Sequence, residues 1–135
     1  MIRLSSFLRG TLIADCIFSG VSALAFVLDA AALAGLTELP EQLLRETGLF
    51  LILYAALVGG LASRTATARA WIVLVISGNA AWTVASIALL FSSAVHPNLF
   101  GEMVVVAQAI ATAVLAELQY LGLRRSGSAM LVGGA

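Results

Sequence analysis

The stretch LIADCIFSGVSALAFVLDA, residues 12–30, has the length and apolar character of a membrane-spanning helix, yet it contains Asp15 and Asp29. A helix needs about 20 mostly apolar residues to cross the hydrocarbon layer of a membrane. A charge at the centre of such a helix costs about 3 kcal/mol on insertion scales, so an acid within a span needs a physical reason to be there. The fold and the role of the chain both depend on how these two aspartates are accommodated.

The composition of the whole chain agrees with a membrane environment. The 135 residues, enough for one domain, are 61% hydrophobic and 10% charged, whereas a soluble domain is about 25% charged. Too few polar side chains exist to cover a folded surface in water, so we expect lipid to be the main solvent. All seven basic residues are arginine, they balance seven acidic residues, and they form no basic patch of the kind that binds nucleic acid.

Four segments are long and apolar enough to span, or nearly so: about residues 11–33, 43–63, 70–91 and 103–123. Lipid offers no hydrogen bonds, so each span must satisfy its own backbone groups as a helix, and the runs are too long for barrel strands. The chain is therefore predicted to be all-α, a transmembrane four-helix bundle with short loops over residues 1–125, followed by a flexible tail over residues 126–135. The first apolar run continues past the signal-peptidase-like Ala23-Leu24-Ala25, which favours a retained helix over a cleaved signal.

The arginines predict the orientation of these helices. Six lie on one side of the predicted membrane, and only Arg45 lies on the other: Arg3, Arg9, Arg64, Arg69, Arg124 and Arg125 share one side. Cytoplasmic loops carry the excess of positive charge. Both termini are therefore expected in the cytoplasm.

Polar residues recur at helical spacing within the spans. Asp15, Ser19 and Ser22 share one face of the first span, and Asn79, Trp82 and Ser86 share a face of the third. A bundle would turn both stripes inward, because buried hydroxyl and amide groups link membrane helices. The indole N–H of Trp82 then needs a partner, for which Asn79 or a neighbouring helix is expected.

Glu117 lies at a depth similar to that of Asp15, near the arginine-bearing side, and two roles for this pair of acids remain open. In the first, Asp15 and Glu117 form ion pairs that stabilise the bundle, with partners among Arg9, Arg64, Arg69 and Arg124. In the second, one of the two acids carries a proton or binds a cation, the default hypothesis for an acid inside a membrane. Glu117 is nine residues past Gln108, about half a turn around the helix, so these two side chains are not expected to line one pocket.

Motifs of soluble enzymes are missing from the sequence. It has no phosphate-binding loop, no Ser-His-Asp set and no metal-ligand spacing, and its one histidine and one cysteine stand alone. We therefore expect no enzymatic activity, no cofactor and no metal.

Residues 79–86 and 117–125 resemble parts of small, mostly uncharacterised bacterial four-helix integral membrane proteins, and the broader DoxX-like group is similar in size and helix count. Small multidrug transporters also carry a carboxylate early in their first helix, but their usual glutamate and its surrounding aromatic residues are not matched here. The resemblance implies a multi-pass protein of the bacterial inner membrane.

From the sequence we expect a structural protein or an accessory subunit of a membrane complex. The alternatives are a small proton- or cation-coupled transporter that uses Asp15 or Glu117, and a redox or quinone-linked accessory protein suggested by the DoxX-like resemblance alone. The expected partners are the lipid bilayer and a second copy or another membrane protein, and not nucleic acid.

Overall fold

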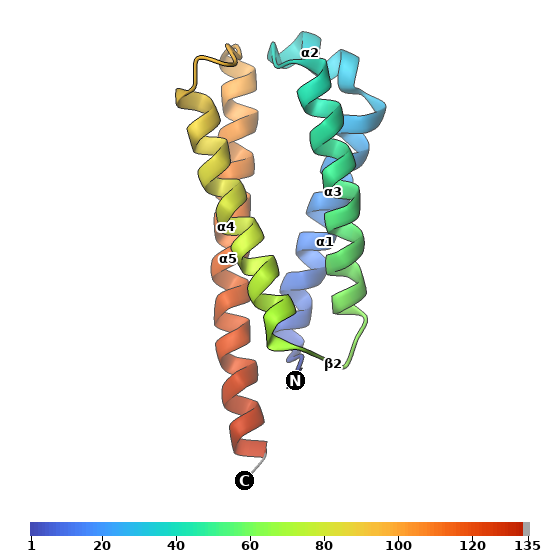
Figure 1. Ribbon diagram of the computed structural model, residues 1–135, viewed down its shortest axis with the longest axis vertical. Coiled ribbons are helices and arrows are strands. Elements are labelled where there is room, and N and C mark those ends of the chain that lie inside the picture. Colours follow the sequence, from blue (N-terminus) through green and yellow to red (C-terminus); the bar gives the residue numbers. More distant parts are fainter. Residues whose placement is uncertain (134–135) are drawn as a thin grey trace.

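A computed structural model describes residues 1–133, with side chains described as far as Ser126. In this part of the chain, five helices and two short strands follow one another (Figure 1): β1 (Ile2–Arg3), α1 (Ser6–Leu28), α2 (Ala30–Thr37), α3 (Glu41–Ala62), β2 (Ala66–Thr67), α4 (Arg69–Phe91) and α5 (Leu99–Gly133). The fold is therefore essentially all-helical, as the sequence predicts.

Four of these helices, α1, α3, α4 and α5, are long and apolar enough to cross a membrane, with mean hydropathy between 1.5 and 2.0. Their outward faces carry large apolar side chains that would be costly in water: Leu53 is 72% exposed and Phe91 is 88% exposed. Length, hydropathy and exposed apolar surface together indicate a multi-pass membrane protein.

The long helices are arranged as two antiparallel hairpins. α1 packs along α3, α4 packs along α5, and contact between α1 and α5 joins the two pairs. Figure 1 shows the hairpins close together at the end that holds the N-terminus, whereas α3 and α4 diverge toward the other end. We call the first end the arginine-rich end, because Arg3, Arg9, Arg64 and Arg69 lie there. Its apolar core contains Leu8, Leu12, Val58, Ile72, Val75 and Leu123.

The first residues of the chain connect the hairpins at the arginine-rich end. β1 pairs antiparallel with β2, so that Ile2 lies opposite Thr67. The Ser5 backbone N–H and the Ser126 hydroxyl lie 3.3 Å apart, which links the start of α1 to the last part of α5 whose side chains are described. Residues before the first span therefore contribute to packing rather than extending freely.

The helices differ from the predicted segments most clearly at two places. The first span was expected to continue to residue 33, but α1 ends at Leu28 and α2 begins at Ala30. Asp29 between them has φ −115° and ψ 26°, outside the helical region, so the chain bends there. At the other terminus, a tail was expected from residue 126, but α5 continues to Gly133, because no proline stops it. Residues 134–135 of the predicted tail lie outside the described part.

Close backbone packing joins the hairpins again at the end opposite the arginines. The Thr37 carbonyl accepts a hydrogen bond of 3.1 Å from the Asn98 N–H, and the Asn98 side chain donates to the Leu36 carbonyl at 2.8 Å. A Cβ at Gly101 would clash with the carbonyl oxygen of Thr37. Only glycine lets the start of α5 approach the end of α2 so closely.

We therefore expect Gly101→Ala to lower the free energy of unfolding by about 1–3 kcal/mol, because the added methyl group forces α2 and α5 apart. Thermal unfolding in detergent, followed by circular dichroism, measures this effect. Gly35→Ala is the matched control, since a Cβ at Gly35 meets nothing within 4 Å. Equal melting temperatures for the two variants would contradict the close approach.

Candidate functional site

Asp15 lies fully buried between the hairpins, where its carboxylate accepts four hydrogen bonds. Ser19 Oγ donates to Oδ1 at 3.1 Å, and three donors converge on Oδ2: Tyr54 Oη at 2.9 Å, Asn79 Nδ2 at 2.8 Å and Gln119 Nε2 at 2.7 Å. The donors come from α1, α3, α4 and α5. An ionised carboxylate only accepts hydrogen bonds, at about four lone-pair positions. The four donors around Asp15 match this capacity.

The groups around Asp15 are neutral, which overturns the predicted ion pairs. Within residues 1–126, the one ion pair joins Arg45 to Glu41 at 2.7 Å on the surface. Arg9 instead donates to the carbonyl of Arg64 at 2.9 Å, and Arg69 is exposed. The expected pairing of Asp15 with arginine is therefore wrong, because its carboxylate points between the hairpins while the guanidinium groups stay at their ends.

Glu117 has no part in this cluster. It lies exposed on α5, two residues from the buried Gln119. Arg124, another predicted partner, lies over the Tyr120 ring at 5.8 Å from its centroid. The expected ion pair of Glu117 is therefore wrong for the described residues. Glu117 also faces away from the cluster, because side chains two positions apart on a helix point in different directions.

The other polar residues predicted for the site divide into two groups. Ser19 and Asn79 join Asp15, whereas Ser22 accepts a hydrogen bond of 3.2 Å from Gln108, further from the arginine-rich end. Ser86 lies still further along α4 and takes no part in the Asp15 cluster. Both predicted stripes face the space between the hairpins. They meet where Asn79 binds Asp15, whereas Ser22 and Ser86 lie farther along that space.

Trp82 stacks on Phe50 from α3, with ring centroids 6.1 Å apart and an interplanar angle of 5°. Its indole N–H has no hydrogen-bond partner among residues 1–126. The predicted bond from the indole N–H to Asn79 Oδ1 is absent among these residues, where Asn79 instead donates through Nδ2 to Asp15 Oδ2 and to Gln119 Oε1. Trp82 therefore joins the two hairpins through stacking.

Tyr54 and Gln119 are the site residues that sequence reasoning missed. Gln119 lies seven residues after Thr112 and eleven after Gln108, which places all three on one face of α5. That spacing could have identified Gln119. Tyr54 stands alone in an apolar helix, and no pattern in the sequence brings it to Asp15.

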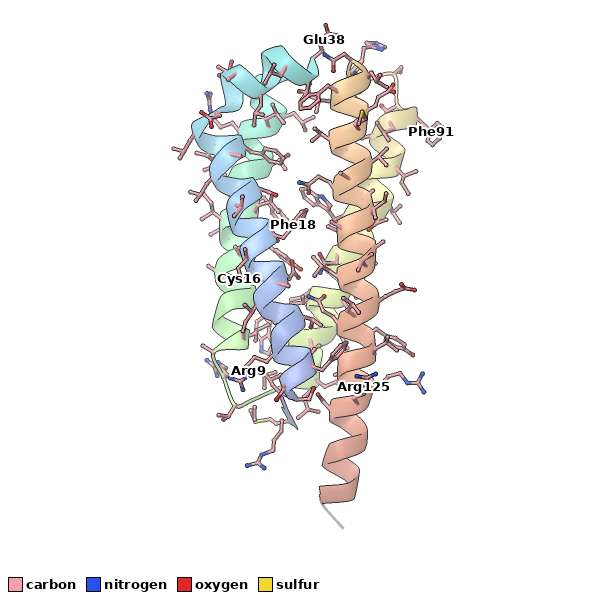
Figure 2. The ribbon with its side chains drawn as sticks, turned by 180° about the vertical axis from the view of Figure 1, so that it is seen from behind. Arg9, Cys16, Phe18, Glu38, Phe91 and Arg125 are labelled. Atoms are coloured by element: carbon pink, nitrogen blue, oxygen red, sulfur yellow. The ribbon has the colours of Figure 1, made fainter. Side chains whose placement is uncertain are left out.

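A cavity of about 420 Å³ lies beside the cluster, and we call it the inner cavity. Ser19, Tyr54 and Asn79 line it, so the groups that bind Asp15 also form its polar wall. Aromatic rings form much of the remaining wall, and Figure 2 shows Phe18 on the side of α1 that faces α5. The other lining residues are Phe50, Leu51, Gly78, Ala81, Trp82, Ala85, Gln108 and Thr112.

A second cavity of about 320 Å³, the outer cavity, continues toward the end opposite the arginines. Trp82, Ala85 and Gln108 line both cavities, so these residues form the boundary between them. Both volumes fall within the range of about 300–1,000 Å³ that is usual for small-molecule sites.

If the four hydrogen bonds hold Asp15 in place, Gln119→Leu should lower the free energy of unfolding by about 1–3 kcal/mol, because a buried acceptor loses a donor. Thermal unfolding in detergent measures the loss. Glu117→Gln is the control on the same helix and should leave the melting temperature unchanged. A destabilised Glu117→Gln beside a stable Gln119→Leu would contradict the assigned contacts.

Comparison with protein-family models, curated proteins and solved structures finds no match to this chain. The resemblance to DoxX-like proteins stays a prediction. The case for a function therefore rests on the contacts of Asp15 and on the two cavities.

Proposed function

We propose that this chain is a small ion-coupled membrane transporter in which Asp15 binds the coupling proton or monovalent cation. The observation that carries the proposal is a fully buried carboxylate, surrounded by neutral donors, beside a cavity that all four long helices line. An acid within a membrane span is costly in free energy, which makes it a functional-site hypothesis by default.

The charge itself argues against a purely structural role. Asparagine has nearly the shape of aspartate and could link the same helices through hydrogen bonds without a buried charge. Burying an ionised group costs more than burying a neutral amide, even when both are hydrogen-bonded. Aspartate at position 15 is therefore best explained by the binding of a positive ion.

The same contacts would couple ion binding to the positions of the hairpins. Tyr54 reaches Asp15 from the α1–α3 hairpin, whereas Asn79 and Gln119 reach it from the α4–α5 hairpin. A proton on Oδ2 of Asp15 would add a donor where three donors already converge, so at least one of those bonds would have to break. Ion binding would thus weaken the attachment of one hairpin to the other and favour a second arrangement.

The second candidate is a structural protein or accessory subunit. It is favoured by the completeness of the cluster, since donors from all four long helices satisfy Asp15. In that role, the carboxylate would specify how the helices pack, and its charge would move no ion.

Asp15→Asn separates the two candidates. In liposomes that contain the purified protein, we expect proton or cation flux to fall to the background of empty liposomes, while circular dichroism and size-exclusion profiles match those of the native protein. Glu117→Gln, an exposed acid on α5, is the control and should keep native flux. Native flux from Asp15→Asn, or no substrate-linked ion flux from the native protein with any candidate substrate, would reject the transporter and favour the structural role.

The proposal places the protein in the bacterial inner membrane as a four-helix bundle with both termini in the cytoplasm. Six of seven arginines on one side of the helices support this orientation.

Single cysteines test the orientation. With Cys16 replaced by alanine, Arg64→Cys should resist a membrane-impermeant maleimide in intact cells and react after permeabilisation. Glu38→Cys, at the other end of the helices, should react in both states. The opposite pattern would invert the proposed topology.

A further inference from the structure

A further cavity, of about 400 Å³, lies at the arginine-rich end, and we call it the interfacial pocket. It is formed where α3 ends and the chain turns through β2 into α4, at the lower end of the molecule in Figure 1. It shares no lining residue with the inner or the outer cavity. Its lining residues are Ala56, Leu57, Gly60, Leu61, Ser63, Arg64, Thr67 and Trp71.

The polar side of the interfacial pocket contains a hydroxyl group that is bound by nothing in residues 1–126. Thr67 is only 3% exposed, yet it lines the pocket. Every fully enclosed side-chain oxygen or nitrogen in that part of the chain has a hydrogen-bond partner, so the unpaired Thr67 Oγ1 must reach the pocket surface. The neighbouring Ser63 hydroxyl, by contrast, already donates to the Gly60 carbonyl at 2.7 Å. Thr67 therefore offers a hydrogen-bond donor to a ligand in the pocket.

The interfacial pocket is also cationic. Arg64 lines it, its guanidinium group forms no ion pair within residues 1–126, and the lining contains no acid. Arg9 donates to the Arg64 carbonyl at 2.9 Å and so brings a second positive charge to the same turn. Arg69 adds a third at the start of α4. Such a group of arginines attracts an anion, and a guanidinium group binds phosphate oxygens through two parallel hydrogen bonds.

The apolar side of the pocket continues onto the outward surface of α3. Ala56 and Gly60 are exposed and lie about one turn apart, and Leu53 before them is 72% exposed. A Cβ at Gly60 would meet nothing within 4 Å, so there is free space beside the helix at this level. From α4, Trp71 contributes an indole ring, the side chain that membrane proteins favour at the level of the lipid head groups.

We propose that the interfacial pocket binds the phosphate group of an acidic phospholipid, with one acyl chain along Ala56 and Gly60. The arginines and Thr67 need a phosphate oxyanion, which a lipid or free phosphate could supply. The apolar half of the lining favours the lipid, because it would gain nothing from a free ion. A zwitterionic lipid fits less well, since its ammonium group would meet the arginines. The inference does not depend on transport, because the Asp15 cluster shares none of these residues.

Trp71 reports directly on occupancy of the pocket. In a Trp82→Phe background it is the remaining tryptophan, and bromine atoms on a neighbouring acyl chain quench its fluorescence. Brominated phosphatidylglycerol and brominated phosphatidylcholine with the same chains are compared at equal mole fractions in nanodiscs of unbrominated phosphatidylcholine. We expect phosphatidylglycerol to bind about tenfold tighter. Equal quenching by the two lipids overturns the proposal, and this comparison needs no change at the pocket.

Arg64→Gln tests whether the preference comes from the pocket or from the charge of the whole surface. It should weaken phosphatidylglycerol binding about fivefold, the effect of one positive charge at a membrane surface. Arg124→Gln is the matched control, because it removes the same charge from the same end, where Arg124 lies over the Tyr120 ring and outside the pocket. Equal losses in the two variants would assign the preference to general surface charge and overturn the site.

Thr67→Val keeps the shape of the side chain and removes the hydroxyl group. We expect phosphatidylglycerol binding to weaken about fivefold, because a phosphate oxygen loses a donor. Thr65→Val removes an exposed hydroxyl that does not line the pocket and should leave the affinity unchanged. Native affinity in Thr67→Val would overturn the placement of the phosphate group.

Inorganic phosphate distinguishes the two sources of the oxyanion. It is added to nanodiscs that contain brominated phosphatidylglycerol, with sodium chloride at equal ionic strength as the reference. Quenching of Trp71 should be the same in both salts, because the acyl chain holds the lipid in place. Recovery of fluorescence in phosphate but not in chloride would show that the pocket takes the free ion, and would overturn the lipid as its ligand.

Discussion

The arrangement of the helices depends on one constraint: a carboxylate buried among apolar side chains must find hydrogen-bond donors within the protein. Asp15 finds them on four helices, and three of the four donors converge on a single oxygen atom. Because each donor is fixed in its own helix, the depth and rotation of α1, α3, α4 and α5 are all set relative to this point. Apolar packing alone would allow many registers at similar energy, since lipid and leucine are equally apolar.

The hairpins touch at several levels, and space remains between these levels. Close packing around Leu8, Leu12 and Ile72 joins them at the arginine-rich end, and the Thr37–Asn98 contact joins them at the other. Between these ends, the Phe50–Trp82 stack connects α3 to α4 across the inner cavity. The hairpins are thus tied at both ends and at one polar layer. An ion that altered the hydrogen bonds of Asp15 would act on the layer that lies between the two ends.

Charge and shape together give the site its proposed chemistry. The polar wall is built from the groups that bind Asp15, so a ligand in the inner cavity would sense the carboxylate through Tyr54 and Asn79 without displacing them.

The sequence by itself determined the solvent, the number of long helices and the inward direction of the stripe at Asp15, because hydropathy and helical periodicity are local properties of the chain. Only the tertiary structure decided the partners of Asp15. The arginines are close to Asp15 in the sequence pattern, but their side chains stay at the ends of the helices. The actual partners Tyr54 and Gln119 are 39 and 104 residues away from Asp15 in the chain, so no local pattern indicates them. The bend at Asp29 and the continuation of α5 past residue 126 likewise went beyond the pattern of apolar residues. Which side chains meet depends on the rotation of each helix about its axis, and that rotation is set by packing among all the helices at once.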